Sequence, residues 1–224
     1  MKTVALVPIK LNNERFPGKN IKTFFDGTPL MHLIQRVCLL AREIDKTYVY
    51  CSDESVTEFL LPDVKFLQRP EYLNRNEYGS NHIIAEFIKT IDADVYLETH
   101  ATAPFARAET FDFCINKVAS GEYDSAFCAK MLKTFLWRNG KPLNFDPNNF
   151  PRTQDLPIIY AEAPGAYVFS KNTFLKYGRR VGENPYIHEV SDIEATDIDY
   201  PEDFETANII YREIILRDDF NPTS

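Results

Sequence analysis

The stretch VPIKLNNERFPGKN, residues 7–20, ends an apolar run and turns at once into basic and amide side chains. The run that leads into it, residues 3–9, has the length and composition of a buried strand. The loop then presents six polar side chains, Lys10, Asn12, Asn13, Arg15, Lys19 and Asn20. A connection between two elements needs only turn residues. The stretch therefore predicts a first strand that ends in a polar site.

Short apolar runs alternate with amphipathic segments of helical length through the first 130 residues. Strands are expected over residues 3–9, 47–51, 64–67, 93–99 and 125–129. Helices are expected near residues 29–44, 55–61, 81–91 and 108–119. Strands separated by helical segments indicate βαβ units, so the pattern predicts an α/β fold with a mostly parallel sheet.

This alternation stops between about residues 133 and 160, where Pro, Asn and Arg are frequent. The segment predicts loops with short antiparallel strands, packed on the main sheet or on another subunit. Strands are expected again over residues 166–169 and 194–198, and an amphipathic helix over 201–216. The sequence contains no internal repeat and no low-complexity linker, so we expect one domain over residues 1–224 with an excursion over about 133–160.

Charge and composition limit the classes of partner. The chain has 224 residues, of which 44% are hydrophobic, and a formal net charge of −8. A chain of this size buries roughly 70 to 75% of its unfolded surface, which is enough for a core. The negative charge opposes binding to nucleic acid or to an anionic membrane, so a phosphate site must be a local basic pocket.

The apolar runs and the cysteines predict a cytoplasmic protein. No apolar run approaches the roughly 18 residues of a membrane span, and the N-terminal run is too short for a signal peptide. Four cysteines, Cys38, Cys51, Cys114 and Cys128, lie inside apolar segments and form no CxxC pair. This placement favours reduced, buried thiols over disulfides or a zinc site.

The loop after the first strand is the first candidate site. In open α/β sheets, ligands bind beyond the carboxyl ends of the strands. Lys and Arg are charge partners for phosphate oxygens, and Gly18 allows backbone N–H groups to approach closely. The patterns GxGxxG and GxxxxGK[ST] are both absent, which argues against a dinucleotide fold and a P-loop NTPase. A solvated basic turn is the alternative.

A second cluster of charge lies near the end of the chain. In an extended segment, side chains two residues apart project to the same side, so Asp197 and Asp199 would point together while Ile198 turns to the core. A carboxylate pair suits Mg²⁺, which keeps waters and substrate phosphates in its other positions. The alternative is a helix cap, because Asp199 precedes Pro201 and Glu202.

Seven pieces of sequence occur in the order found in one family of enzymes. They are FPGKN (16–20), CSD (51–53), QRP (68–70) with Ser80 downstream, TAP (102–104), PRTQDLP (151–157), GAY (165–167) and DIDYPEDF (197–204). Together they resemble the acylneuraminate cytidylyltransferase family, which activates sialic acid and related keto-sugar acids as CMP-sugars. The resemblance implies a mostly parallel, Rossmann-like nucleotide-diphospho-sugar transferase sheet of the GT-A-like type, flanked by helices, with a small antiparallel dimerisation excursion.

The resemblance also implies roles for individual residues. Catalytic roles would fall to Lys19, Asp199 and Lys10. The nucleotide would be bound by Lys10, Asn13, Arg15, Lys19, Asn20, Arg69 and Ser80, of which Arg69 and Ser80 would border the cytidine. The acceptor would meet His100, Thr102, Arg152 and Gln154. Asp197 and Asp199 would bind Mg²⁺, and a homodimer would bring the excursion of one subunit to the site of the other.

The chain departs from the family pattern at four places. Lys10 stands where the family usually has Arg, and Asn13-Glu14 where it has Ser-Lys, with Arg15 as a replacement cation. His100 stands in place of the usual Gln, and Pro164 in place of the usual Asn. These changes concern the identity of the acceptor more than the type of reaction. His100 could contact the acceptor, shuttle a proton, or only bond into the edge of the sheet.

The function expected from these features is transfer of CMP from CTP to a small acidic acceptor with release of pyrophosphate. The acceptor would be a sialic-acid-like sugar acid or another nonulosonate. Two alternatives stay within nucleotide binding: a cytidylyltransferase that acts on a phosphate or phosphonate, and an inactive nucleotide-binding homologue. A sugar-binding or scaffolding module that binds no nucleotide is the alternative of a different class.

Overall fold

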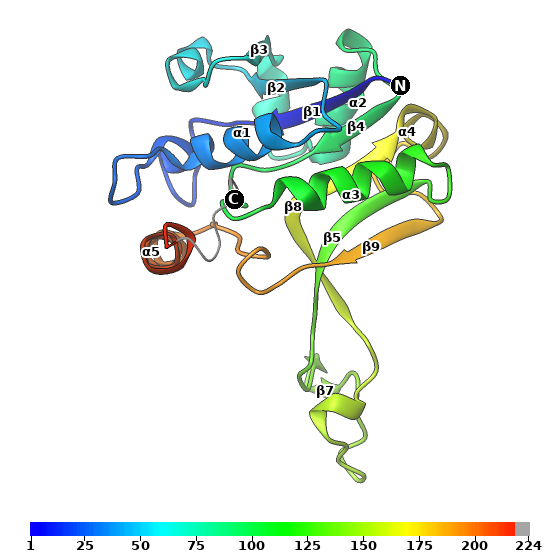
Figure 1. The fold of residues 1–224 in the computed structure, drawn as a ribbon. Helices are drawn as coiled ribbons and strands as arrows, with labels where there is room; N and C mark the ends of the chain where they lie inside the picture. Colours follow the sequence, from blue (N-terminus) through cyan, green and yellow to red (C-terminus); the bar gives the residue numbers. More distant parts are fainter. Residues whose placement is uncertain (218–224) are drawn as a thin grey trace.

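A seven-stranded sheet forms the body of the protein, in the order β3-β2-β1-β4-β8-β5-β9 (Figure 1). The computed structural model describes residues 1–217. The strands are β1 Thr3–Pro8, β2 Lys46–Cys51, β3 Val64–Gln68, β4 Val95–Glu98, β5 Ser125–Met131, β8 Tyr160–Ser170 and β9 Pro185–Glu189. Among the seven strands of this sheet, within residues 1–217, only β8 runs antiparallel to its neighbours. The predicted mostly parallel α/β sheet is therefore confirmed.

Helices cover both faces of the sheet. They are α1 Leu30–Leu40, α2 Ser80–Thr90, α3 Ala108–Ala119, α4 Lys171–Tyr177 and α5 Pro201–Ile210. In Figure 1, α1 and α3 lie in front of the sheet, and α2 and α4 lie behind it. Alternation along β1 supplies both cores, because Ala5 and Val7 pack with the first pair of helices, whereas Val4 and Leu6 pack with the second.

The strand order places two loops side by side at the carboxyl edge of the sheet. β1 pairs in parallel with β4, so the loops that follow these two strands leave the sheet together. Ile9 continues the first strand by donating its N–H to the carbonyl of Tyr50, and Thr99 N–H donates to Leu6. This edge, where the chain order changes direction across the sheet, is where open α/β folds bind ligands.

The predicted strand over residues 194–198 is wrong, and the last strand is β9. Backbone N–H groups in that segment close local turns instead, from Ala195 to Ser191 and from Thr196 to Ile193, and Ile198 N–H donates to Thr102 at 2.9 Å. β9 pairs with β5 alone and begins with proline, as edge strands often do. β9 is half-exposed and mixes polar and apolar residues. Its sequence therefore lacks the regular alternation of polar and apolar residues that would predict a strand.

Helical elements differ from the expected ones mainly at their ends. The predicted helix over 55–61 is a 3-10 helix, Glu54–Phe59, and the one over 201–216 is α-helical only to Ile210 and continues as a π-turn, Tyr211–Ile215. α4 was not predicted.

The proposed single domain over 1–224 stays a prediction, and its last seven residues lie outside the described part of the chain.

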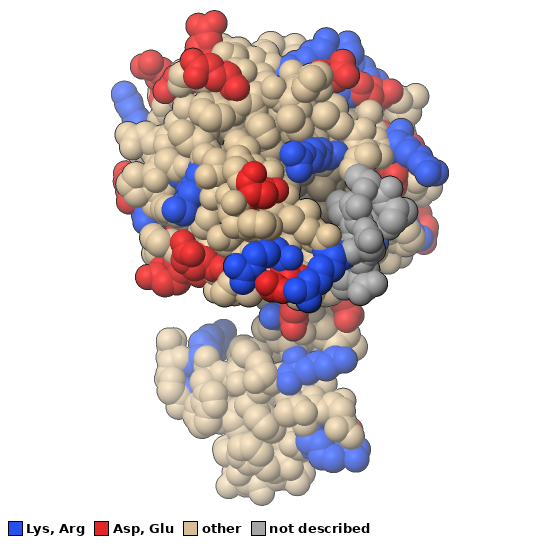
Figure 2. Space-filling view, turned by 60° about the vertical axis from the view of Figure 1, so that its left-hand side comes forward, with Lys and Arg blue, Asp and Glu red and all other residues tan. Residues whose placement is uncertain are grey.

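β5 and β8 extend away from the body into an arm, residues 132–159. In Figure 1 the arm projects beyond the sheet, and in Figure 2 it stands apart from the body as a separate lobe. It carries the short hairpin β6 Trp137–Arg138 and β7 Lys141–Pro142, which agrees with the predicted short antiparallel strands. The arm projects away from the main sheet of its own chain (Figure 1), and its packing on another subunit stays a prediction.

The four cysteines are buried free thiols, as predicted. Burial raises the pKa of Cys38 to about 12 and leaves it a neutral thiol. Over residues 1–217, no helix combines the length and the apolar character needed to cross a bilayer.

An aromatic cluster attaches the C-terminal helix to the loop after β1. Phe204 is buried on α5, its ring stacked 4.9 Å from that of Phe24 and edge-on to Phe16 at 6.1 Å between centroids. Tyr211 closes the cluster at 4.7 Å from Phe24. This packing places the segment before α5 beside the loop 10–18.

We expect Phe204→Ala to lower the free energy of unfolding by about 3–5 kcal/mol, because truncation leaves a cavity among fixed rings. Urea denaturation measures the change. Ile209→Ala on the exposed face of the same helix is the control and should change stability by less than about 0.5 kcal/mol. Equal losses in the two variants would show that the cluster does not anchor this helix.

Candidate active site

A tight turn presets the loop after β1. Gly18 adopts a left-handed conformation, with φ 70°, at the start of the 3-10 helix Lys19–Ile21. The N–H of Lys19 donates to the carbonyl of Phe16 at 3.1 Å, and Asn20 Nδ2 donates to the Lys10 carbonyl at 2.8 Å. Asn20 is therefore a brace within the loop as well as a lining residue. The turn fixes the backbone of Lys19 before any ligand binds.

The loops enclose a cavity of about 330 Å³ in which the lining Lys and Arg side chains are not balanced by any Asp or Glu of the described chain. Its cationic side chains are Lys10, Lys19, Arg69 and Arg75. The other lining residues are Pro8, Asn13, Asn20, Leu73, Asn74, Asn76, Tyr78, Ser80, Ile83, His100, Ala101 and Thr102. No Asp or Glu of the described chain lines it, although the protein has a net charge of −8. A cavity lined by four cations and no carboxylate favours an anionic ligand.

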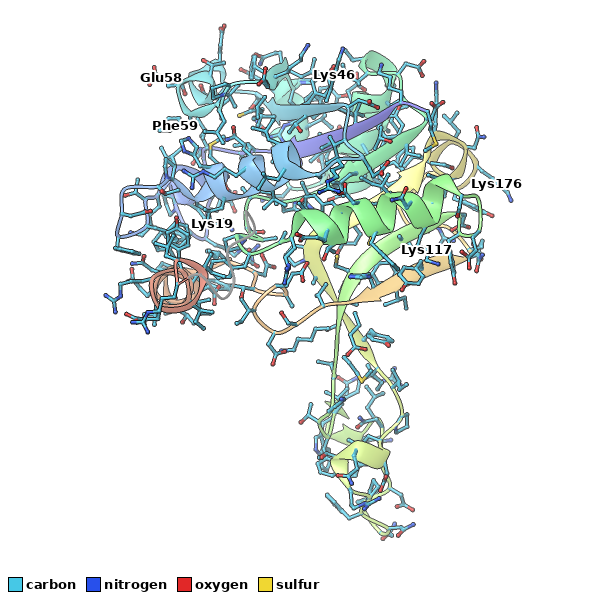
Figure 3. The ribbon with its side chains drawn as sticks, in the orientation of Figure 1. Lys19, Lys46, Glu58, Phe59, Lys117 and Lys176 are labelled. Carbon is cyan, nitrogen blue, oxygen red and sulfur yellow. The ribbon has the colours of Figure 1, made fainter. Side chains whose placement is uncertain are left out.

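Lys19 joins the first loop to the end of the chain. Its side chain is 7% exposed, and Nζ donates to the Ile198 carbonyl at 2.6 Å and to Asp199 Oδ1 at 3.3 Å. Figure 3 shows Lys19 between α1 and α5. Arg15 takes the other oxygen of the same carboxylate, with NH1 2.8 Å from Asp199 Oδ2, and lies over the ring of Tyr200. Both oxygens of Asp199 therefore face cations.

Ile198, between Asp197 and Asp199, is fully buried, as the extended-segment argument predicts. The cap alternative for Asp199 is wrong, because Asp203 Oδ2 accepts the N–H groups of Asp199 and Tyr200 at 2.9 and 2.8 Å. Asp203 thus caps α5 and leaves the Asp199 side chain to the site. Desolvation by the surrounding protein and the neighbouring Asp199 charge raise the pKa of Asp197, and hydrogen bonding by Thr102 opposes them.

Two carboxylates are the acidic donors available to a metal here. Residues 1–217 contain no group of three or more His, Cys, Asp or Glu side chains arranged to hold a metal ion. Asp197 and Asp199 nevertheless fit Mg²⁺, which is often bound through one or two carboxylates plus substrate phosphates. They do not fit zinc or a fully protein-ligated calcium, which need more protein donors.

Arg69 is a buried cation without a carboxylate partner in the described chain. It is 3% exposed, NH2 donates to Asn74 Oδ1 at 2.8 Å, and Nε has no partner among the described residues. Burial lowers its pKa. Asn13 Oδ1 is a second buried atom of the lining that lacks a partner in the described structure. A buried donor and a buried acceptor left unpaired in one cavity indicate groups that a ligand completes.

Eight of the predicted site residues line this cavity, and five do not: Arg15, Asp197, Asp199, Arg152 and Gln154. Lys10, Asn13, Lys19, Asn20, Arg69, Ser80, His100 and Thr102 line it. Arg15 lies at the edge of the cavity, where it forms an ion pair with Asp199. Arg152 and Gln154 lie in the arm, where Arg152 binds Asp155 through two hydrogen bonds of 2.7 and 3.1 Å. Within one chain, the arm does not bring these two residues to the cavity.

Sequence reasoning missed the wall formed by Asn74, Arg75, Asn76 and Tyr78, between the 3-10 helix Glu71–Asn74 and α2. The signal available was the run LNRNEYGS, a second cluster of amides and Arg after a strand. Asn74 also holds the Lys10 side chain in place, because the Asn74 carbonyl accepts a hydrogen bond from Lys10 Nζ at 3.0 Å. Glu98, buried beside His100, was missed because it ends an apolar strand.

Comparison with known proteins agrees with this geometry. Residues 4–217 match the family described as Cytidylyltransferase. The chain belongs to the cytidylyltransferase family. It is 24% identical to N-acylneuraminate cytidylyltransferase of Oncorhynchus mykiss over 88% of this chain and 48% of the relative. It is 22% identical to pseudaminic acid cytidylyltransferase of Campylobacter jejuni serotype O:2 over 95% of this chain and 97% of the relative. The chain thus spans about half the length of the first of these relatives.

Solved structures show the same fold. CMP:2-keto-3-deoxy-manno-octonic acid synthetase complexed with CTP superposes with a TM-score of 0.70 at 15% identity, over 95% of this chain and 99% of that one. 4-diphosphocytidyl-2C-methyl-D-erythritol synthase of Anaerococcus prevotii gives a TM-score of 0.66 at 14% identity, over 94% and 98%. These neighbours confirm the predicted nucleotidyltransferase sheet.

The buried, unpaired charge of Arg69 separates ligand binding from stability. We expect Arg69→Met to leave the urea midpoint of unfolding unchanged or raise it, because a desolvated cation is replaced by an apolar side chain of similar length. The same variant should lose most of the thermal stabilisation given by inorganic tripolyphosphate. Arg212→Met, an exposed Arg after α5, is the control and should keep that stabilisation. A strongly destabilised Arg69→Met would make Arg69 a structural residue.

Proposed function

We propose that this chain transfers CMP from CTP to a sugar acid of the nonulosonate class and releases pyrophosphate. The observation that carries the proposal is the acid-free cavity with four cations, joined through Lys19 to the carboxylate pair Asp197 and Asp199. Its volume lies at the low end of the range for small-molecule sites. The relatives named for N-acylneuraminate and pseudaminic acid support a carboxylated sugar as acceptor.

The reaction is one in-line displacement. The acceptor hydroxyl oxygen forms a bond to the α-phosphorus of CTP and gives up its proton to solvent water. The bond from that phosphorus to the oxygen bridging to the β-phosphate breaks, and pyrophosphate leaves with that oxygen. Catalysis of such a transfer consists mainly of positioning and of stabilising charge. Lys10 and Lys19 would face the triphosphate oxygens, and Arg69 and Ser80 would border the cytidine.

Asp197 and Asp199 would hold Mg²⁺, which would offset the negative charge of the phosphate groups when bound. Arg15 and Lys19 differ in their freedom to exchange partners at this point. Arg15 has a side chain 58% exposed and can leave Asp199 for a phosphate oxygen, whereas Lys19 stays fixed by the Ile198 carbonyl. Arg15 thus neutralises Asp199 when no nucleotide is present.

The arm supports a homodimer in which each subunit completes the other's site. Its rings pack on one another, with Phe135, Phe145 and Phe150 4.8–5.0 Å apart between centroids. Large apolar side chains of the arm, Trp137 and Phe150 among them, are more than half exposed. Exposed apolar groups on a projecting element favour an interface. In such a dimer, Arg152 and Gln154 would reach the acceptor from the partner subunit.

The four buried free thiols support a cytoplasmic location, where cysteines stay reduced.

No observation favours a phosphate or phosphonate acceptor. A panel of acceptors distinguishes these two classes from a sugar acid.

Pyrophosphate release from CTP and Mg²⁺ with a panel of nonulosonic acids, sugar phosphates and phosphonates tests the reaction. We expect turnover with one or more of the acids, and a loss of about 10²–10³-fold in kcat for Lys19→Ala and for Asp199→Asn, as for removal of one group that stabilises developing charge. Lys46→Ala on the exposed start of β2 is the matched control and should keep turnover. Unchanged turnover in both site variants would exclude this site. Turnover with phosphates alone would show that the acceptor is a phosphate and not a sugar acid.

Mixing two inactive variants tests the shared site. Lys19→Ala lacks a body residue and Arg152→Ala an arm residue, so a mixed dimer holds one intact site. After subunit exchange we expect about a quarter of wild-type turnover, because half of the randomly formed dimers are mixed. A mixture of Lys19→Ala with Asp199→Asn, both in the body, is the control and should stay inactive. No recovery in the first mixture would show that the arm acts within its own chain or not at all.

A further inference from the structure

Glu98 is a fully buried carboxylate at the end of β4, two residues before His100. One of its oxygens, Oε2, accepts a hydrogen bond from Arg180 NH1 at 2.6 Å. The guanidinium of Arg180 lies over the ring of Tyr167, 3.3 Å from its centroid, which holds the ion pair in place. The other oxygen, Oε1, has no hydrogen-bond partner among the described residues. A buried oxygen left in this way costs free energy unless a donor reaches it.

The donor that faces this oxygen is His100. Its Nε2 lies 3.9 Å from Glu98 Oε1, about 1 Å beyond hydrogen-bond length. Contacts in binding sites are often long without ligand and tighten in the complex. The ring of His100 lines the cavity, and about a quarter of the side chain is exposed. His100 therefore lies between a buried carboxylate and the space for ligand.

The protonation of His100 follows from its surroundings. Burial lowers its pKa, with Arg180 and Lys19 acting in the same direction and Glu98 and Asp197 against it, so the ring is neutral at neutral pH. A neutral imidazole carries one N–H. Because a carboxylate oxygen only accepts, an imidazole that bonds to Glu98 must carry its proton on Nε2. Nδ1 then keeps a lone pair.

We propose that Glu98 is a positioning residue that holds His100 as the Nε2–H tautomer, so that the acceptor subsite selects a hydrogen-bond donor at His100. The group bound there is a hydroxyl or an amide N–H of the acceptor, and its carboxylate is bound elsewhere. A glutamine at position 100 would offer both an N–H and a carbonyl oxygen, whereas this imidazole offers Nδ1 alone. The specificity part of this inference rests on the proposed function; the tautomer does not.

Substitution of Glu98 by glutamine should reverse the tautomer. Arg180 requires an acceptor, so the amide oxygen of Glu98→Gln stays with Arg180 and the amide NH₂ turns to His100. Nε2 then accepts, and the proton moves to Nδ1. The side chain keeps its size, and thermal unfolding verifies that the fold is retained.

Long-range ¹H–¹⁵N correlation spectra of the ¹⁵N-histidine-labelled full chain at neutral pH test the tautomer directly, with the His100 signals assigned by their loss in His100→Gln. We expect a protonated Nε2 in the wild type and a protonated Nδ1 in Glu98→Gln. Glu194→Gln is the matched control, since Glu194 is also a buried carboxylate with an unpaired Oε1 but lies outside this cavity. It should leave the His100 signals unchanged. A wild-type ring protonated on Nδ1, or no change in Glu98→Gln, would overturn the proposal.

Kinetics test the consequence for the acceptor. We expect Glu98→Gln to raise the KM for the acceptor about ten-fold, the equivalent of one lost hydrogen bond, with an unchanged thermal shift by CTP and Mg²⁺. With an acceptor analogue that lacks the hydroxyl or amide N–H that donates to His100, wild type and Glu98→Gln should have the same KM. A reversed tautomer with an unchanged acceptor KM would overturn the role in specificity. Absence of any thermal shift by CTP in the wild type would instead reject the proposed function and leave the tautomer result standing.

Discussion

Burial of the Lys19 ammonium is the constraint on which the site depends. A buried ammonium needs hydrogen-bond acceptors, and the ones it has are the Ile198 carbonyl and Asp199, almost 180 residues later in the chain. The loop after β1 and the segment before α5 are therefore joined by one side chain. The aromatic cluster of Phe16, Phe24 and Phe204 lies beneath this contact and limits how far the two segments can separate. The site and the C-terminal packing thus form one structural unit.

Charges are segregated around this contact in a way that suits one class of ligand. The protein is acidic overall, yet the acids near the cavity are placed at its edge, as Asp197 and Asp199, or behind its wall, as Glu98. Each of these has a separate partner: Thr102 for Asp197, Arg15 and Lys19 for Asp199, and Arg180 for Glu98. Of the four cations that line the cavity, Lys10 and Arg69 have no carboxylate partner in the described chain and are left to a ligand. Long-range repulsion from the acidic surface is offset only at short distance, which favours a small polyanion over a polymer.

The sequence allowed prediction of those features that depend on local patterns. Apolar runs of strand length located β1 to β5, loop chemistry located Lys19 and the Asp197–Asp199 pair, and the family resemblance located Arg69. It did not allow prediction of β9, because an edge strand that pairs on one side needs little apolar alternation. Residues 194–198 do not form the predicted strand, because their N–H groups close local turns and reach Thr102. The alternative that Asp199 caps α5 is wrong because Asp203, in the first turn of α5, accepts hydrogen bonds from the N–H groups of Asp199 and Tyr200. Such choices between equivalent acceptors are decided by tertiary packing.

The arm and the Glu98 cluster show two further kinds of information that a linear pattern lacks. Arg152 and Gln154 follow a recognisable motif, yet the chain carries them away from its own cavity, so the role proposed for them requires a second subunit that the sequence does not describe. Glu98 lies in an apolar strand and its significance arises only from Arg180, which packs against it from 82 residues away and takes one oxygen. The remaining oxygen faces His100 because β4 ends there. A residue that acts by orienting another can therefore be found only once both partners and the space between them are known.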